Sequence, residues 1–366
     1  MTVILFTNTL CVKDGWSQVG AQIFKQIQEN YTKNIFVFTA HKHRKEDKVL
    51  IGLMSEAFFK HKFFSIALDF FIVLLKTFTN RKDIKAIICN VEYYAFIAFI
   101  FAKIYKKPLI LVAHGTYALR LPERSALYRL AFKAADKVVC VSRYTKSKVY
   151  AERFADIDQL SVINLGVDKD KFYPSDNSSR MNRIIFVGNA KPRKGLVKLL
   201  QAMVKASKEL EDIELKVVGE IDKHTKSFFQ LNDIIAKNGL NVDFCGRKSD
   251  EELKSLYQSG KLNVLLSQEI GGAFEGFGLV HLEANACGSL TVGSLHSGNE
   301  DAIQSHCGFL IHSNDVNELA GIIVSICSLE NYPKIDFNSI RGWDEFGSEF
   351  ISIIDDLVRH KGIQTT

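Results

Sequence analysis

Short runs of strand-forming residues alternate with longer helix-forming segments along nearly the whole chain. In the first half, stretches of helical spacing, one of them near residues 17–29, separate the runs TVILFT, NIFVFTA, AIICNV, PLILVAH, KVVCVS and LSVINLG. Strands that are separated by helices form parallel, doubly wound sheets, because each parallel connection needs a crossover. The alternation therefore predicts an α/β fold.

The same alternation begins again after one segment without periodicity. Residues 171–182, KFYPSDNSSRMN, gather Pro, Ser, Asn and Asp, which indicates a linker at 175–182. Beyond it come RIIFVG, a helix over 195–209, ELKVVGE, a helix over 225–238, VDFCG, the helix SDEELKSLYQSG and NVLLS. We therefore expect two Rossmann-like domains, 1–174 and 183–340, facing each other across a cleft. A C-terminal helix within 341–366 should pack back on the first domain.

The position of a binding site follows from this architecture. Ligands of doubly wound sheets bind at the carboxyl ends of the strands, so the loops after RIIFVG, KVVGE, VDFCG and NVLLS should line one wall. The longest apolar runs are too short and interrupted to span a bilayer. The opening MTVILFTNTL lacks the charged start of a secretory signal, so we expect a cytoplasmic protein. The seven cysteines form no CxxC pair and suit reduced core thiols.

Positive charge is concentrated in the first half of the chain. Residues 1–170 hold 26 Lys and Arg against 15 Asp and Glu, or +11, whereas the remainder holds 21 against 26, or −5. This half suits an anionic membrane surface or an acidic acceptor, with an ordinary solvated surface as the alternative. The densest basic run, 41–48, lacks aromatic residues for stacking on bases, so no nucleic-acid partner is expected.

Two apolar stretches of the first half have helical spacing. Residues 58–76 are rich in phenylalanine and lysine, and they suit an ordinary packed helix, with a membrane-surface helix as the alternative. Residues 93–107 are nearly all apolar and predict a helix that covers the sheet.

The stretch EGFGLVHLE, residues 275–283, combines two acids with a glycine-rich loop. Glycines at 276 and 278 leave the backbone bare where a helix is expected to begin, so amides near Phe277, Gly278, Leu279 and Val280 can approach a phosphate. Carboxylates such as Glu275 and Glu283 are better suited to accept hydrogen bonds from hydroxyl groups. A ligand with hydroxyls at both ends and phosphate between them is a nucleotide sugar.

At this spacing the two acids resemble the E-x7-E signature of the retaining glycosyltransferases of family 4, which have the GT-B fold. Other segments are similar to that family along nearly the whole chain, namely VINLGVDKDKFYP (162–174), FVGNAKPRKGLVKLLQA (186–202), VDFCGRKSDEELKSLYQSG, SRYTKSKV, SGNEDAI and RGWDEFGSEFISIIDDL. The resemblance implies transfer of a hexose-type sugar from a UDP- or GDP-linked donor to a glycan or lipid-linked acceptor. It implies no metal and no further cofactor.

The resemblance also implies a role for individual residues of the second domain. Glu283 would bind the ribose hydroxyls, Glu275 the hydroxyls of the donor sugar, and the amides of Phe277, Gly278 and Leu279 the diphosphate. Lys194, with Arg193 beside it, would neutralise the leaving diphosphate. Gly246 and Lys248 would border the base.

In the first domain, the resemblance implies two further residues. His114, at the end of a strand, would lie near the reacting carbon, and Gly15 would belong to a loop over the phosphates. Catalytic roles are thus expected for His114, Glu275 and Lys194.

Two positions depart from the family pattern. Asn189 stands where many members carry arginine, and Trp16 stands where they carry a second glycine. A neutral amide donates hydrogen bonds but supplies no charge, so a non-catalytic nucleotide-sugar-binding subunit is an alternative function. A phosphorylase or an epimerase of the same fold is another. The DKD at 168–170 is interpreted as part of a turn and not as a metal site.

Overall fold

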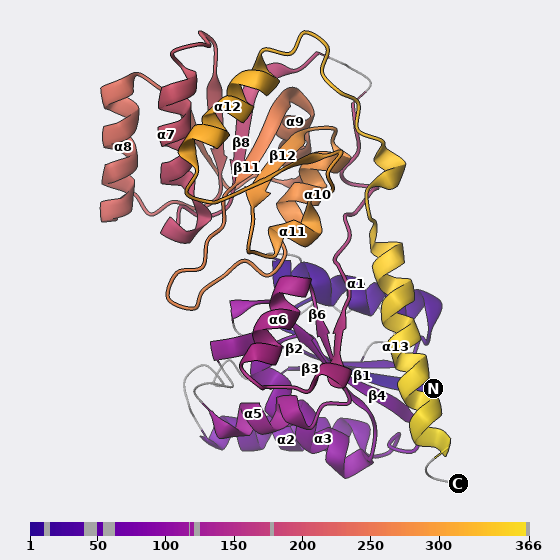
Figure 1. Ribbon diagram of the computed structural model, residues 1–366. Helices are drawn as coiled ribbons and strands as arrows, with labels where there is room; N and C mark the ends of the chain where they lie inside the picture. Colours follow the sequence, from indigo (N-terminus) through magenta and orange to yellow (C-terminus); the bar gives the residue numbers. More distant parts are fainter. Residues whose placement is uncertain are drawn as a thin grey trace. The chain divides into compact units, whose positions relative to one another are not determined.

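The chain forms two compact units, each built around its own parallel sheet (Figure 1). The computed structural model describes residues 1–10, 15–39, 50–53, 63–116, 118–120, 125–175 and 179–363, without the side chains of 50–53, 63–69 and 361–363. Unit 1 comprises Met1–Asn164 and Trp343–Thr366, and unit 2 comprises Leu165–Gly342. The basic run 41–48 lies outside the described residues. The predicted α/β class with two doubly wound domains is confirmed.

The sheet of unit 1 has seven strands in the order β3-β2-β1-β4-β5-β6-β7, and all of its pairs are parallel. Their bounds are β1 Thr2–Phe6, β2 Ile35–Thr39, β3 Leu50–Leu53, β4 Ile84–Cys89, β5 Leu109–Ala113, β6 Lys137–Cys140 and β7 Leu160–Val162. The strands β1, β2 and β5 are buried at every position. They read as apolar runs because helices cover both faces of such a sheet.

Helices cover the two faces of this sheet unequally. The chain moves one way from β1 to β2 and the other way from β4 to β7, so right-handed crossovers place α1 on one face and α2, α3, α5 and α6 on the other. The bounds are α1 Gly15–Asn30, α2 Phe63–Thr77, α3 Ala95–Tyr105, α5 Ala126–Lys133 and α6 Arg143–Ala151. The last helix, α13 (Trp343–Ile363), packs against α1, where Gln26 Nε2 donates to Asp344 Oδ1 at 3.2 Å.

The sheet of unit 2 has six parallel strands in the order β10-β9-β8-β11-β12-β13. They are β8 Met181–Val187, β9 Glu214–Val218, β10 Asn241–Gly246, β11 Gly260–Leu265, β12 Leu290–Ser294 and β13 Gly308–Ile311. The chain leaves β8 toward β9 but returns to pair β11 with β8, so the direction of winding reverses between these two strands. Ligand sites of doubly wound sheets form at such a reversal, beyond the carboxyl ends of the strands.

The helices of unit 2 enclose a continuous apolar core on one sheet face. Leu199, Leu200 and Met203 of α7 and Leu319 and Ile323 of α12 pack on buried strand residues there. The helices are α7 Leu196–Ala206, α8 Lys226–Asn238, α9 Asp250–Ser259, α10 Leu279–Ala286, α11 Asn299–Ala302 and α12 Val316–Cys327. Five of the six described cysteines are buried, and Cys245 is half-buried. None of the helices in the described part of the chain is both long and apolar enough to cross a membrane.

Candidate active site

The turn after β8 and the segment after β11 lie in direct contact at the point where winding reverses. Gly195, at φ +78°, ends the short 3-10 helix Pro192–Lys194, and a Cβ there would lie 2.4 Å from the carbonyl oxygen of Leu266. The amide of Gln268 donates to the carbonyl of Arg193 at 2.8 Å. Only glycine allows this approach, and it fixes the cations Arg193 and Lys194 beside the end of β11.

These cations meet the first glutamate of the EGFG loop. Glu275 Oε2 accepts a hydrogen bond from Lys194 Nζ, a second from Arg193 Nη1 at 3.2 Å and a third from Ser267 Oγ at 3.3 Å. The Glu275 side chain is 17% exposed and that of Lys194 is 13% exposed. All three bonds go to one carboxylate oxygen, so Oε1 receives no hydrogen bond from the residues that the structure describes.

The charge of Glu275 is secured by these contacts. Burial alone works to raise the pKa of this carboxyl, but the charges of Lys194 and Arg193 outweigh it and lower the pKa to about 2. The site therefore holds one carboxylate and two cations at neutral pH, with a net positive charge close to the carboxyl ends of β8 and β11.

The glycine-rich loop is shaped by a second segment behind it. Gly278 has φ +98° and is the N-cap of α10, with no side chain capping the helix end. A Cβ on Gly298 would lie 2.2 Å from the carbonyl oxygen of Gly276, and the amide of Gly298 donates to the carbonyl of Glu275 at 3.1 Å. Asn299 Nδ2 donates to the carbonyl of Phe277 at 3.2 Å. Because the carbonyls of Glu275 and Phe277 accept hydrogen bonds from Gly298 and Asn299, the backbone amides at the uncapped start of α10 can bind an anion.

A buried histidine lies directly behind this helix end. His281 Nδ1 is 2.5 Å from Thr291 Oγ1, and a Cβ added to Gly278 would approach the His281 ring to 2.9 Å. Burial lowers the pKa of His281 to about 3, and the nearby charge of Lys194 acts in the same direction, whereas Glu275 opposes it. The imidazole is therefore neutral beneath the loop.

Glu283 lies on the second turn of α10 and is 8% exposed. Its charge helps to raise the pKa of Lys171, although the larger cause is the hydrogen bond from Lys171 Nζ to Asp250 Oδ2 at 2.9 Å. Lys171 follows the DKD segment, which forms a turn in which Asp168 Oδ1 accepts from the amide of Asp170.

The carboxyl ends of β9 and β10 complete this edge of the sheet. Gly219, at φ +136°, approaches Gly188 so closely that a Cβ would lie 2.4 Å from its carbonyl oxygen, and Asn189 follows directly. Gly246, at φ +66°, ends β10 with open space where a Cβ would stand. Lys248 Nζ lies 2.9 Å from Glu252 Oε1, and Glu252 also forms the capping box of α9 with Ser249, so this cation is paired with the first turn of the helix that follows it.

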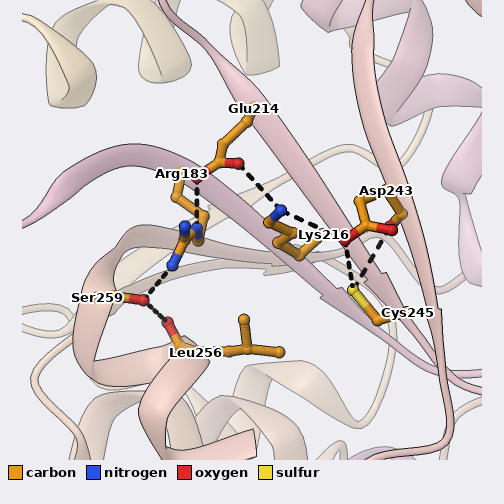
Figure 2. Close-up of polar contacts among 7 residues, drawn as sticks. All are labelled: Arg183, Glu214, Lys216, Asp243, Cys245, Leu256 and Ser259. Carbon is orange, nitrogen blue, oxygen red and sulfur yellow. Dashed lines mark hydrogen bonds and ion pairs between the residues drawn. The ribbon is translucent and has the colours of Figure 1, made fainter.

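A charged row ties the edge strand β10 to its neighbours (Figure 2). Arg183 Nε donates to Glu214 Oε1 at 2.6 Å, and Lys216 Nζ bridges Glu214 and Asp243 at 3.1 and 3.3 Å. These residues alternate with core residues and so lie on the sheet face opposite α7 and α12. Cross-strand pairs of this kind stabilise the pairing of β10 with β9, whose register shifts between Phe244 and Gly246.

In unit 1, the predicted residue His114 lies at the carboxyl end of β5. Its Nε2 is 2.7 Å from the carbonyl oxygen of Asn90 and 3.0 Å from Asn90 Oδ1, so Nε2 carries the proton and donates it. Asn90 follows β4, and its Nδ2 donates to Thr7 Oγ1 beyond β1. Winding reverses between β1 and β4, which is where a ligand site is expected in this sheet.

The carboxyl of Glu92 accepts a hydrogen bond from the backbone amide of His114. Glu92 is 2% exposed, its Oε1 accepts from the amide of His114 at 2.9 Å, and its Oε2 has no partner in the described part of the chain. Burial raises the pKa of Glu92 to about 7, although its backbone hydrogen bonds oppose the shift.

Gly15 and Trp16 belong to the same edge of unit 1. Gly15 begins α1, and the ring centroid of Trp16 lies 6.4 Å from that of His114 and 6.5 Å from that of Tyr93. The carbonyl of Trp16 accepts from Asn90 Nδ2 at 3.1 Å. The residue that departs from the family pattern is therefore packed beside His114.

Several residues of these clusters were not singled out from the sequence. Asn90 directly follows β4 and Ser267 lies two residues beyond β11, so the rule that ligands meet strand ends could have identified them. Gly298, Asn299 and Glu92 carry no such signal, because their contacts join segments that are distant in the chain.

Comparison with known protein families matches two models to this chain. The model described as Glycosyl transferases group 1 matches residues 168–335, and the model described as Glycosyltransferase Family 4 matches residues 33–171. Together they extend from residue 33 to residue 335.

Among curated proteins, the chain is similar to two actinobacterial mannosyltransferases. It is 28% identical over 227 residues to the MMP alpha-(1->4)-mannosyltransferase of Mycolicibacterium hassiacum, covering 61% of this chain and 51% of that protein. It is 23% identical to the GDP-mannose-dependent monoacylated alpha-(1-6)-phosphatidylinositol monomannoside mannosyltransferase of Corynebacterium glutamicum, covering 52% of each. The chain spans about half the length of the curated relatives it matches.

Solved structures share the fold over nearly the whole chain. HepE of Anabaena, in complex with UDP and glucose, superposes with a TM-score of 0.75 at 18% identity, covering 98% of this chain and all of HepE. A glycosyltransferase of Rickettsia africae gives a TM-score of 0.77 at 18% identity, covering 98% of both chains. At this identity the likeness concerns the fold.

Proposed function

The chain belongs to the family of glycosyl transferases group 1, and from this premise we propose that it moves a hexose-type sugar from a nucleotide-sugar donor to a glycan or lipid-linked acceptor. The observation that carries the proposal is the cluster of Glu275, Lys194 and Arg193 beside the uncapped start of α10. It combines a site for phosphate with a hydroxyl acceptor, which are the two chemistries that a nucleotide sugar requires.

The donor diphosphate would lie against the start of α10. Backbone amides near Phe277, Gly278, Leu279 and Val280 face an anion there, and Lys194 and Arg193 supply positive charge from the turn after β8. Asn189 would add neutral hydrogen bonds. When the bond between the sugar carbon and the diphosphate oxygen breaks, these groups stabilise the negative charge that develops on the leaving oxygen.

The two glutamates would hold the ends of the donor. Glu275 Oε2 is occupied by Lys194, Arg193 and Ser267, so Oε1 is the atom that would accept hydrogen bonds from the donor sugar. Glu283 would accept from the ribose, and Gly246 and Lys248 would border the base. GDP-mannose in the name of the Corynebacterium relative and UDP in the HepE complex support a nucleotide donor with either base.

The acceptor would be bound by unit 1. His114 is held in one orientation by Asn90 and Glu92, and we propose that it lies near the reacting carbon, with Gly15 in a loop over the phosphates. Transfer would retain the anomeric configuration. The acceptor oxygen bonds the sugar carbon on the face from which the diphosphate departs, and the acceptor proton passes to the leaving phosphate oxygen. No metal ion and no further cofactor enters this scheme.

A cytoplasmic location and peripheral contact with anionic membrane complete the proposal. They are motivated by the basic excess of residues 1–170 and by the lipid-linked acceptor class. No nucleic-acid partner is part of it.

Thermal shift with UDP, GDP and their glucose and mannose derivatives tests donor binding, because a ligand that binds the folded state raises the melting temperature. Release of free nucleotide that requires an acceptor glycan would establish transfer. Acceptor-independent conversion of the sugar would favour an epimerase, and release driven by phosphate would favour a phosphorylase. Tight donor binding without turnover across acceptors would favour a non-catalytic subunit, as the neutral Asn189 suggests. Absence of any shift at millimolar nucleotide would refute the assignment.

A further inference from the structure

Three helices of unit 1, α2, α3 and α5, form a continuous layer on one face of its sheet. α2 and α3 lie side by side, because Phe70 stacks on Phe101 at 5.1 Å and Thr77 Oγ1 lies 2.6 Å from Tyr105 Oη. α3 and α5 are also in contact, and Tyr128 Oη donates to the carbonyl of Tyr93 at 2.9 Å. Figure 1 shows the three helices together on one side of the sheet.

Large apolar side chains project from this layer instead of packing beneath it. Leu75 is 76% exposed and Phe71 is 57% exposed. Several large apolar side chains exposed together mark a surface that contacts a partner or a membrane. Six exposed large apolar side chains belong to α2, α3, α5 and the turn after α2, namely Phe71, Leu75, Phe78, Ile104, Leu127 and Leu130. We refer to these six residues as the apolar surface of unit 1.

The charges around the apolar surface have almost one sign. Segments 70–83, 95–107 and 125–134 contain eight Lys and Arg and one acid, Asp83. Lys82 in the turn after α2, Lys103 in the last turn of α3 and Lys133 at the end of α5 are exposed, and none of them forms a salt bridge with another residue in the described part of the chain. The guanidinium of Arg81 lies over the Phe78 ring at 4.2 Å. Apolar groups interleaved with cations match the interface of an anionic bilayer, where each cation meets lipid headgroups and each apolar side chain enters the acyl boundary.

We propose that the apolar surface of unit 1, with its surrounding cations, docks the protein on an anionic lipid bilayer. A bilayer fits better than a second copy of the chain, because two such surfaces would bring eight cations against eight cations. The docking rests on the membrane contact of the proposed function and assigns it to named residues, but it does not require sugar transfer. It would hold unit 1 at the surface where a lipid-linked acceptor is found.

Flotation with vesicles tests the docking directly, without donor or acceptor. Full-length protein is mixed at low salt with phosphatidylcholine vesicles, or with vesicles in which about a third of the lipid is phosphatidylglycerol. We expect binding to the anionic vesicles that weakens as salt is raised, because salt screens the attraction. Equal binding to both kinds of vesicle, or to neither, would overturn the proposal.

Matched variants locate the surface. Replacing Lys82, Lys103 and Lys133 by alanine should weaken partitioning about a hundredfold, since each cation near the membrane contributes about fivefold. Lys205, Lys208 and Lys226 of unit 2 are also exposed, and replacing them should change partitioning by less than about twofold if contact is confined to unit 1. Equal losses in the two triple variants would overturn the assignment to this surface.

An apolar pair of variants separates lipid docking from self-association. Leu75→Ser should weaken vesicle binding about tenfold, whereas Phe229→Ser, at a 63% exposed position of α8, should not. Sedimentation of the wild type and of Leu75→Ser gives the oligomeric state. A dimer that Leu75→Ser dissociates, with vesicle binding unchanged, would identify a second copy as the occupant and overturn the proposal. Nucleotide thermal shifts, measured separately, show whether the proposed function fails independently.

Discussion

Lys194 and Glu275 form a largely buried ion pair between the turn after β8 and the loop before α10. The pair joins two segments 81 residues apart, and Arg193 and Ser267 donate to the same carboxylate oxygen. In the proposed function, Lys194 would stabilise the leaving diphosphate, and its ion pair with Glu275 would hold it in place before the donor binds.

Removing either member of this pair should impair transfer. We expect Lys194→Ala and Glu275→Gln each to lower turnover at least about tenfold, the effect of losing one transition-state interaction. Lys205→Ala, on an exposed position of α7, is the matched control and should leave turnover unchanged. Steady-state assays with the donor identified by thermal shift measure this. Wild-type turnover in Glu275→Gln would remove this carboxylate from the site.

The shape of the glycine-rich loop should depend on Gly298. A Cβ there would lie 2.2 Å from the carbonyl oxygen of Gly276 and 2.6 Å from the amide nitrogen of Phe277, both backbone atoms that cannot rotate away. We expect Gly298→Ala to lower the free energy of unfolding by about 1–3 kcal/mol and to weaken nucleotide binding.

Gly321 of α12 provides the control for that variant. A Cβ at Gly321 would meet no atom within 4 Å, so Gly321→Ala should be neutral or stabilising by about 0.5–1 kcal/mol, as expected in a helix interior. Denaturant unfolding gives the free energy of unfolding of both variants, and nucleotide titration gives their affinity. Equal nucleotide affinity in Gly298→Ala and wild type would contradict the role given to this contact.

The stability of unit 1 should fall as pH rises through the range in which Glu92 ionises. Burial raises its folded pKa to about 7 from an unfolded value near 4.5, so the folded state binds more protons between these two pH values. The contribution of Glu92 is complete below pH 4.5 and is lost by about pH 7, at roughly 1.4 kcal/mol per pH unit.

Tryptophan fluorescence can measure this effect in unit 1. The chain has two tryptophans, Trp16 and Trp343, and both belong to this unit. Urea midpoints between pH 5 and pH 8 should fall more steeply for the wild type than for Glu92→Gln, which keeps an acceptor for the His114 amide without a titrating proton. Parallel pH profiles would show that Glu92 does not ionise in this range.

Much of the fold was predictable because the strands are local patterns. Runs such as TVILF and LILVA are apolar at every position and separated by helical segments, so they indicate buried parallel strands without tertiary information. Leu50–Leu53 and Gly308–Ile311 were not predicted as strands. Each has only four residues, and one glycine weakens each apolar run.

The candidate site was predictable only in part, because some of its residues lie in one short stretch whereas others are brought together from distant segments. Glu275, Gly278 and Glu283 lie within one short stretch whose spacing is visible in the sequence. The contacts of Glu275 with Lys194, of Gly298 with Gly276 and of His114 with Asn90 join residues 22 to 81 positions apart. Such pairs follow from the order of strands in each sheet, which the sequence pattern alone does not specify.

The region beneath the glycine-rich loop should lose stability as pH falls below about 6.5. Burial lowers the folded pKa of His281 to about 3, so the unfolded state binds more protons between these values, and stability declines toward acid at roughly 1.4 kcal/mol per pH unit. Glu275 does not contribute to this loss between pH 6.5 and 4.5, because its carboxyl titrates only below about 4.5 in the unfolded chain and at still lower pH in the folded protein. Hydrogen exchange of β11 and β12 reports on this region, since both tryptophans lie in unit 1. We expect protection in these strands to fall with pH in the wild type and in the exposed control His224→Gln, and to stay nearly constant in His281→Gln. Identical pH profiles in all three proteins would mean that His281 is not held neutral by burial.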